Sequence, residues 1–181
     1  MARILVTGGV RSGKSRYAET LLDAAAPAAY LTPGYPADPV RDPEWAERVA
    51  AHQARRPAAW RTVETVSLAE AIRAAGEPVL LDCLGTWLTR LLDEWQAWET
   101  PTPTWQPRLD EEVAALAAAV AGHPDIVVVT NEVGWGLVSQ YRSGRVFADQ
   151  LGRINQAVAV VCDEVVLLVA GRPLRLPADA C

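Results

Sequence analysis

Residues 8–15, close to the start of the chain, carry the pattern G-x-x-x-x-G-K-[ST] between a β-branched apolar run and a helical segment. Glycines let successive backbone N–H groups turn inward as an anion nest, and the positive end of the following helix points at the same place. Strand, loop and helix in this order predict a phosphate-binding loop for a polyphosphate. A chance glycine-rich turn is the alternative, and the flanking segments argue against it. The residues assigned to the loop are Gly8, Gly9, Val10, Arg11, Ser12, Gly13, Lys14 and Ser15.

Two side chains of this loop have expected roles in phosphoryl chemistry. Lys14 is expected to reach the β and γ phosphates as a mobile point charge, and the Ser15 hydroxyl is expected to ligate Mg²⁺. Such a site also needs a carboxylate near the metal, at the end of a neighbouring apolar strand. Asp82 ends the run Val79-Leu80-Leu81-Asp82 and is the predicted second metal contact. Asp at a strand-to-helix junction also caps helices well, so an N-cap role for Asp82 remains open.

Short apolar runs alternate with helical stretches along the chain, which predicts the α/β class with helices on both faces of a sheet. Several runs are apolar almost throughout, as expected of parallel strands buried on both faces. The expected strands are residues 4–7, 28–32, 79–82, 126–130 and 165–169, with 174–176 as a short antiparallel edge. The expected helices are residues 13–25, 43–55, 67–75, 83–95, 108–121 and about 144–162.

Three segments outside these elements are rich in turn-forming residues. Residues 33–39 are expected to form an irregular loop at the carboxyl end of the second strand, where ligands bind in open α/β sheets. Residues 99–107 contain three prolines and are expected to form a stiff surface connection without chemistry. Residues 130–136 line the site, form a second ligand loop or form an ordinary turn, and the sequence leaves these interpretations open.

Size and charge limit the partners of the chain. With 181 residues, half of them hydrophobic, we expect one domain spanning residues 1–181. A net charge of -5 and a pI near 5.1 give no general attraction to nucleic acid or to anionic membranes. No apolar run approaches the ~20 residues that span a bilayer, and Met1 leads directly into a strand, so a cytoplasmic location is expected. Cys83, Cys162 and Cys181 lack metal or disulfide spacing and are read as reduced thiols.

His52 lies in a helical segment among arginines, with Arg48 one turn before it and Arg55 and Arg56 within one turn after it. Arginines in this arrangement suit a phosphate or triphosphate presented to the imidazole. From spacing alone, a solvent-facing histidine on a helix is the simpler interpretation.

These motifs together resemble the bifunctional adenosylcobinamide kinase and adenosylcobinamide-phosphate guanylyltransferase family of cobalamin biosynthesis. The likeness covers nearly the whole chain in order. It is carried by residues 4–15, by 48–64 around His52, by 80–84, by 129–136 with its Thr-Asn-Glu-Val-Gly segment, and by motifs within residues 145–165.

The resemblance implies two reactions. ATP or GTP would first phosphorylate the aminopropanol hydroxyl of adenosylcobinamide, and GMP from GTP would then pass through a covalent histidine intermediate to give adenosylcobinamide-GDP. The histidine that carries GMP in the family falls on His52, so His52 and Lys14 are the expected catalytic residues. An imidazole nitrogen can attack the α-phosphorus and so divide one difficult displacement into two easier ones.

The resemblance also implies further contacts and an assembly. Nucleotide contacts are expected at Gln53, Ala54, Arg55 and Arg56, at Glu64 and at Asp82. The implied fold is RecA-like with a P-loop, and the implied assembly is a homotrimer. A plain P-loop small-molecule kinase is the main alternative function, and a nucleotide-dependent assembly module without enzymatic activity is a second.

Overall fold

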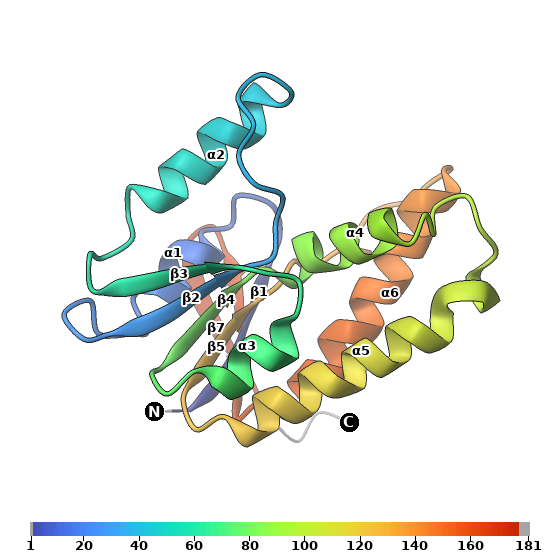
Figure 1. The fold of residues 1–181 in the computed structure, drawn as a ribbon. Helices are drawn as coiled ribbons and strands as arrows, with labels where there is room; N and C mark the ends of the chain where they lie inside the picture. The colour runs from blue at the N-terminus through green and yellow to red at the C-terminus, as the bar shows by residue number, and fades with distance from the viewer. Residues whose placement is uncertain (1, 178–181) are drawn as a thin grey trace.

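A seven-stranded sheet forms the centre of the computed structural model, which describes residues 2–177 (Figure 1). Its strands are β1 (Arg3–Gly8), β2 (Ala28–Thr32), β3 (Trp60–Glu64), β4 (Val79–Asp82), β5 (Ile126–Val129), β6 (Glu164–Val169) and β7 (Arg172–Leu176). Their order is β3-β2-β4-β5-β1-β6-β7. All neighbouring strands pair in parallel except β6 and β7, which are antiparallel. This confirms the predicted α/β class with a mostly parallel sheet and a short antiparallel edge.

Helices cover the two faces of this sheet unequally. The helices are α1 (Lys14–Glu19), α2 (Pro43–Gln53), α3 (Leu68–Ala74), α4 (Leu84–Glu94), α5 (Thr102–Gly122) and α6 (Arg142–Ala159). One face packs against α3, α4, α5 and α6 in the larger core, which includes Leu5 and Leu81. The other face packs under α1 in a smaller core, which includes Val6 and Leu80. Neighbouring strand residues thus enter opposite cores, which explains why the strands are apolar throughout.

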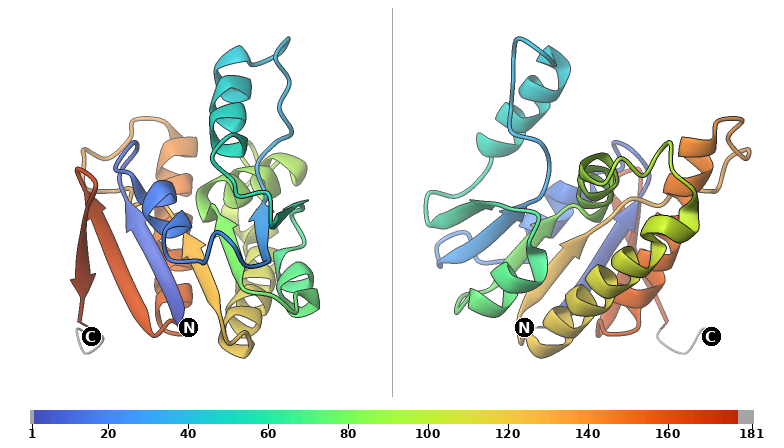
Figure 2. Two further views of the ribbon diagram at one scale, coloured as in Figure 1. Left: turned by 90° about the vertical axis from the view of Figure 1, so that its left-hand side faces the viewer. Right: turned by 45° about the vertical axis from the view of Figure 1, so that its right-hand side comes forward.

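Helix α2 stands away from both cores, beyond the carboxyl ends of the parallel strands (Figures 1 and 2). Asp42 caps it by accepting a hydrogen bond from the Trp45 amide at 2.9 Å, and Pro43 occupies the first turn, where no intrahelical N–H partner is needed. None of its residues is buried. Contacts with other surface segments, described below, therefore decide where this helix lies.

The first helix is shorter than expected. It was predicted over residues 13–25 but ends at Glu19, and the Thr20 hydroxyl donates to the Tyr17 carbonyl at 2.7 Å. The following turn places Leu22 in the smaller core, and the carbonyl of Asp23 accepts a hydrogen bond from the Trp60 indole. Tertiary contacts of the turn thus replace a third and fourth helical turn.

Strand β3 was not predicted. Thr62 and Glu64 are exposed and Trp60 is the buried end of the strand, so β3 is an edge strand without the continuous apolar run of the central strands. Its parallel pairing with β2 supplies the backbone hydrogen bonds that fix it. An aromatic residue followed by Thr and Val is nevertheless a β-prone sequence, and this was the available signal.

The prediction for residues 99–107 was wrong from Thr102 onward. These residues form the first turns of α5, with Pro103 in the first turn and Pro107 inside the helix. Proline is tolerated in a first turn because its missing N–H would lack an intrahelical partner anyway. Trp105 is buried in the larger core, and this packing favours the helix despite the unfavourable Pro107. The predicted irregular loop at 33–39 is confirmed.

Two sequence expectations concern segments outside the site. No helix within residues 2–177 combines the length and the apolar character that a bilayer crossing requires. Cys83 and Cys162 are free thiols, and Cys181 lies outside the described residues.

An ion pair between Arg3 and Asp163 joins the start of β1 to the chain just before β6. The Arg3 guanidinium donates to both carboxylate oxygens at 2.5 and 3.1 Å, and the Arg3 amide donates to Oδ2 at 2.9 Å. These hydrogen bonds lower the pKa of Asp163 to about 2. An unfolded Asp titrates near pH ~3.9, so the pair stabilises the fold above that pH and loses its effect as the pH falls toward the native value.

We therefore expect Asp163→Asn to lower the free energy of unfolding, by an amount that does not change with pH near neutrality. The difference from the wild type should shrink between about pH 4 and pH 2, because protonation removes the same interaction from the wild type. Urea unfolding at stepped pH values measures it. A difference that stays constant down to the lowest pH would contradict this assignment, and adding Arg3→Gln to the variant should bring no further pH dependence.

Candidate functional site

A cavity of about 690 Å³ lies at the carboxyl edge of the sheet, between the loop after β1, helix α2 and the ends of β2, β3 and β4. Parallel α/β sheets bind their ligands at this edge. The predicted site residues that line the cavity are Val10, Arg11, Ser12, Gly13, Lys14, Ser15, His52, Gln53, Arg55, Arg56, Glu64 and Asp82. Gly8, Gly9 and Ala54 lie outside this lining. Segments far apart in the sequence thus meet around one space.

Two glycines give the phosphate-binding loop its shape. Gly13 is the N-cap of α1 with φ of 93°, in the left-handed region that favours glycine. At Gly8 a Cβ would lie 2.6 Å from Ser12 Oγ and 2.7 Å from the Leu168 carbonyl, so only a residue without a side chain fits there. The loop is held to β6 and β7 by a hydrogen bond from the Gly171 amide to the Ser12 carbonyl at 2.9 Å. This hydrogen bond fixes the loop against the turn between β6 and β7.

Lys14 and Ser12 present polar groups that await a partner. The Lys14 ammonium donates to the Gly9 carbonyl at 3.2 Å, within its own loop. Partial burial lowers the pKa of Lys14 from its usual value, while Cys83 and Asp82 oppose that shift. The buried Ser12 hydroxyl has no hydrogen-bond partner. An anion bound in the loop would give the Ser12 hydroxyl a hydrogen-bond partner and the Lys14 ammonium a partner of opposite charge.

His52 comes to the cavity from the last turn of α2, and it faces a carboxylate. Its Nδ1 lies 3.6 Å from Asp82 Oδ2, and its side chain is 28 % exposed. Two contacts help to hold α2 in this position. Arg55 pairs with Glu19 of α1 at 3.3 Å, and the Trp45 indole donates to the Tyr35 carbonyl at 2.8 Å. The interpretation of His52 as a solvent-facing residue is therefore wrong.

Asp82 contacts side chains from two other elements that line the cavity. Its side chain is 9 % exposed, and Oδ2 also accepts a hydrogen bond from the Tyr30 hydroxyl at 2.9 Å. Burial alone would raise the pKa of Asp82, but interactions with His52 and Tyr30 outweigh burial and hold this pKa below its usual value. The Ser15 hydroxyl acts in the same direction. The N-cap alternative is wrong, because Cys83 occupies the N-cap of α4 without a side-chain cap.

Arg56 continues the polar wall of the cavity. Its guanidinium carbon lies 3.9 Å from the centre of the Tyr30 ring, and Nη1 donates to the Thr62 hydroxyl at 3.0 Å. Its Nε is buried without a hydrogen-bond partner. Glu64 lines the same cavity from the end of β3.

Several lining residues were not singled out as site residues from the sequence. Tyr30 lies in the middle of an apolar strand and is 1 % exposed, so it was indistinguishable from a core residue. Thr86 of α4 also lines the cavity, and its hydroxyl donates to the Cys83 carbonyl at 2.9 Å. A polar hydroxyl within two residues of a strand's carboxyl end was the one available signal for Tyr30.

The segment after β5 contributes Asn131 to the cavity lining. The Glu132 amide donates to the Gly8 carbonyl at 3.1 Å and so ties this segment to the phosphate-binding loop. Partial burial raises the pKa of Glu132. Of the interpretations left open for residues 130–136, the structure favours a segment that borders the site at Asn131.

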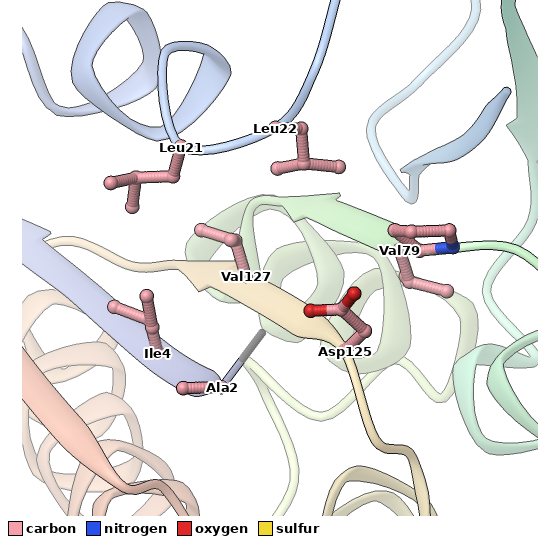
Figure 3. A pocket seen from close by; sticks show the side chains of 8 residues that line it. Ala2, Ile4, Leu21, Leu22, Val79, Asp125 and Val127 are labelled. Atoms are coloured by element: carbon pink, nitrogen blue, oxygen red, sulfur yellow. The ribbon is translucent and has the colours of Figure 1, made fainter. Parts of the chain in front are cut away.

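A second, smaller cavity lies at the opposite, amino edge of the sheet (Figure 3). Its volume is about 210 Å³, and apolar side chains such as Ile4, Leu21 and Val127 surround it, with Asp125 at one side. It contains no basic side chain, so a polyphosphate has no counter-charge there. The cavity at the carboxyl edge is the candidate functional site.

Comparison with known protein families identifies similar chains. Residues 4–176 match a family described as cobinamide kinase / cobinamide phosphate guanyltransferase. The bifunctional adenosylcobalamin biosynthesis proteins CobU of Salmonella typhimurium and Escherichia coli are 39 % and 40 % identical, over 96 % of this chain and 98 % of each relative. The bifunctional adenosylcobalamin biosynthesis protein CobP of Pseudomonas aeruginosa is 39 % identical over 98 % of both chains.

A solved structure is also similar in part. It belongs to a prototypical ATPase from the type III secretion system of pathogenic bacteria and superposes with a TM-score of 0.43 at 14 % identity. The superposition covers 91 % of this chain and 50 % of the ATPase chain.

Proposed function

The chain belongs to the cobinamide kinase / cobinamide phosphate guanyltransferase family, and we propose that it phosphorylates adenosylcobinamide and then joins GMP to the new phosphate. The observation that carries this proposal is the meeting of Lys14 and His52 at one cavity. A phosphate-binding loop suffices for a kinase. A guanylyl transfer that passes through an enzyme-bound GMP also needs a nucleophile near the nucleotide, and the imidazole is placed to supply it.

The kinase half uses the phosphate-binding loop. The backbone amides of residues 8–15 and the Lys14 ammonium bind the β and γ phosphates of ATP or GTP. The aminopropanol hydroxyl attacks the γ-phosphorus, the bond from that phosphorus to the β–γ bridging oxygen breaks, and the hydroxyl proton is released. Lys14 stabilises the charge that develops on the departing nucleoside diphosphate.

Ser15 and Asp82 fit a magnesium ion. A hydroxyl and an ionised carboxylate are the oxygen ligands that Mg²⁺ prefers, and the lowered pKa of Asp82 keeps its carboxylate charged at neutral pH. When bound, the ion would neutralise charge on the β and γ phosphates. We infer that Ser15 and Asp82 hold it.

The guanylyl half uses the histidine. A neutral imidazole nitrogen of His52 attacks the α-phosphorus of GTP, the bond to the α–β bridging oxygen breaks, and pyrophosphate leaves. A phosphate oxygen of adenosylcobinamide phosphate then attacks the same phosphorus and displaces the imidazole. Arg55 and Arg56 are proposed to stabilise the triphosphate, and Gln53, Ala54 and Glu64 are proposed nucleotide contacts.

Incubation of the protein with GTP labelled at the α-phosphate tests the guanylyl half. We expect acid-labile label on the protein, as a phosphoramidate requires, and transfer of that label to adenosylcobinamide phosphate on addition of this substrate. GTP labelled at the γ-phosphate should leave the protein unlabelled and should label adenosylcobinamide instead. Phosphorylation without any α-label on the protein would reduce the function to that of a plain kinase.

We also propose three properties of the whole protein: a single nucleotide-binding domain over residues 1–181, a homotrimeric assembly and a cytoplasmic location. Exposed apolar side chains on the segment between β5 and α6 support an assembly of several subunits. Trp135, Leu137 and Val138 are 74 %, 102 % and 83 % exposed. Apolar side chains gathered on one exposed segment are typical of contact surfaces.

A further inference from the structure

One oxygen of Asp82 has two partners from different elements. The Tyr30 hydroxyl of β2 donates to Oδ2 at 2.9 Å, and Nδ1 of His52, from α2, lies 3.6 Å from the same atom. The other oxygen, Oδ1, is a partner in neither interaction. Oδ2 therefore serves the imidazole and Oδ1 remains for the proposed magnesium ion.

Tyr30 is held rigidly enough to aim this carboxylate. Tyr30 is 1 % exposed, and the centre of its ring lies 6.4 Å from the centre of the Trp60 ring. The guanidinium carbon of Arg56 lies 3.9 Å from the centre of the Tyr30 ring. The Tyr30 hydroxyl lies 2.9 Å from Oδ2 and is the donor in this hydrogen bond. A neutral tyrosine and an ionised carboxylate can form this bond in one direction only.

The same carboxylate bears on the proton of the imidazole. An ionised carboxylate accepts hydrogen bonds and cannot donate them, so a hydrogen bond between the two groups requires hydrogen on the ring nitrogen that faces the carboxylate. In a neutral imidazole the other nitrogen then has the free lone pair. For His52 the nitrogen that faces Asp82 is Nδ1.

We propose that Tyr30 and Asp82 are positioning residues that hold His52 in its Nδ1–H tautomer, so that Nε2 is the nitrogen that receives GMP. This inference rests on the proposed function. The Nε2 lone pair forms the bond to the α-phosphorus as the bond to the α–β bridging oxygen breaks and pyrophosphate departs. No proton moves in this step. The ring becomes cationic, and its retained Nδ1–H faces the Asp82 carboxylate, which stabilises the new charge.

The chain contains two histidines, and the second serves as an internal reference. Nδ1 of His123 accepts a hydrogen bond from the Asp125 amide at 3.2 Å, so His123 is an Nε2–H tautomer when neutral. We expect nitrogen NMR of the wild-type protein with labelled histidine, in alkaline solution, to show one ring of each tautomer. The signals that disappear in His52→Ala assign the Nδ1–H ring. An Nε2–H tautomer at His52 would overturn the inference, and this measurement requires no variant at Tyr30 and no activity.

The second test separates positioning from a purely structural role of Tyr30. Tyr30→Phe removes the hydroxyl and keeps the ring, and we expect the rate of labelling by α-labelled GTP at saturating GTP to fall about 10-fold. This decrease should exceed any decrease in the phosphorylation rate, because the kinase half does not use the imidazole. Equal decreases in both rates, or labelling at the wild-type rate, would refute the inference.

Thr20→Val is the control for loss of a hydroxyl outside the site. It removes a hydroxyl that donates to the Tyr17 carbonyl at 2.7 Å, from a residue that does not line the cavity. We expect its ratio of labelling to phosphorylation to equal that of the wild type. A wild-type protein that takes no label contradicts the proposed function itself, whereas the NMR spectrum still decides the tautomer.

Discussion

Replacing His52 by alanine is expected to abolish the covalent GMP–protein intermediate and to lower GMP transfer to adenosylcobinamide phosphate on the order of 10⁴-fold or more. The side chain supplies the attacking lone pair, and of the two histidines in the sequence His52 is the one that lines the cavity. Alanine is a good helix former, and α2 contributes no buried residue, so the fold should survive. The measurement is retention of α-label on protein after removal of free GTP.

Two further readings make this prediction specific. Phosphorylation of adenosylcobinamide by His52→Ala should remain within several-fold of the wild type, because the phosphate-binding loop is unchanged. His123→Gln is the control for the other histidine: glutamine still accepts a hydrogen bond from the Asp125 amide, and this variant should label normally. Label retained at the wild-type level in His52→Ala would assign the covalent step to another residue.

The central part of the fold was predictable because its signal is local. Strands such as Val79–Asp82 and Ile126–Val129 are buried on both faces, so every residue in them is apolar or ends the strand. Edge strand β3 has one buried residue at its start and exposed residues beyond it, and its pairing with β2 decides its conformation. The start of α5 was missed for a similar reason: Trp105 packs in a core formed by distant segments, and no local rule for prolines contains that contact.

The candidate site could be predicted from the sequence where its residues form one continuous segment or end a predicted strand. The phosphate-binding loop is one continuous segment, and Asp82 could be found because a strand's last residue lies at the ligand edge. Tyr30 was not predicted as a site residue, because the alternation of a buried strand shows which residues share a face but not which hydroxyl reaches a carboxylate on the next strand. The meeting of His52 with Asp82 depends on the path of α2 outside the cores, which periodicity does not determine.

The cavity geometry is consistent with the proposal that both reactions use one nucleotide site. The phosphate-binding loop and His52 border the same space and are joined through Asp82. The two reactions require attack at opposite ends of a triphosphate, at the γ-phosphorus and at the α-phosphorus. A loop that grips the β phosphate serves both, so the same binding energy supports each step.

Lys14→Ala should therefore impair both reactions, with the larger loss in the kinase half. Lys14 is the one lysine of the chain, every other basic residue that is not histidine being arginine. Phosphoryl transfer depends on positioning and on stabilisation of charge, and removal of one such group costs on the order of 10²–10³-fold in rate. We expect the phosphorylation rate at saturating nucleotide to fall by this amount. The guanylyl step should lose GTP affinity and a smaller part of its rate, because the contact proposed for Lys14 is with the β and γ phosphates and not with the attacked α-phosphorus.

Lys14→Arg separates charge from shape in this prediction. A guanidinium keeps the positive charge but is planar and larger than an ammonium, so it should restore nucleotide affinity more than phosphorylation rate. Steady-state rates of both reactions for the three proteins, with circular dichroism and thermal unfolding as checks on folding, measure the effect. If folded Lys14→Ala phosphorylated adenosylcobinamide at a rate near that of the wild type, the loop would hold the nucleotide through its backbone amides alone, and Lys14 would have no part in the transition state.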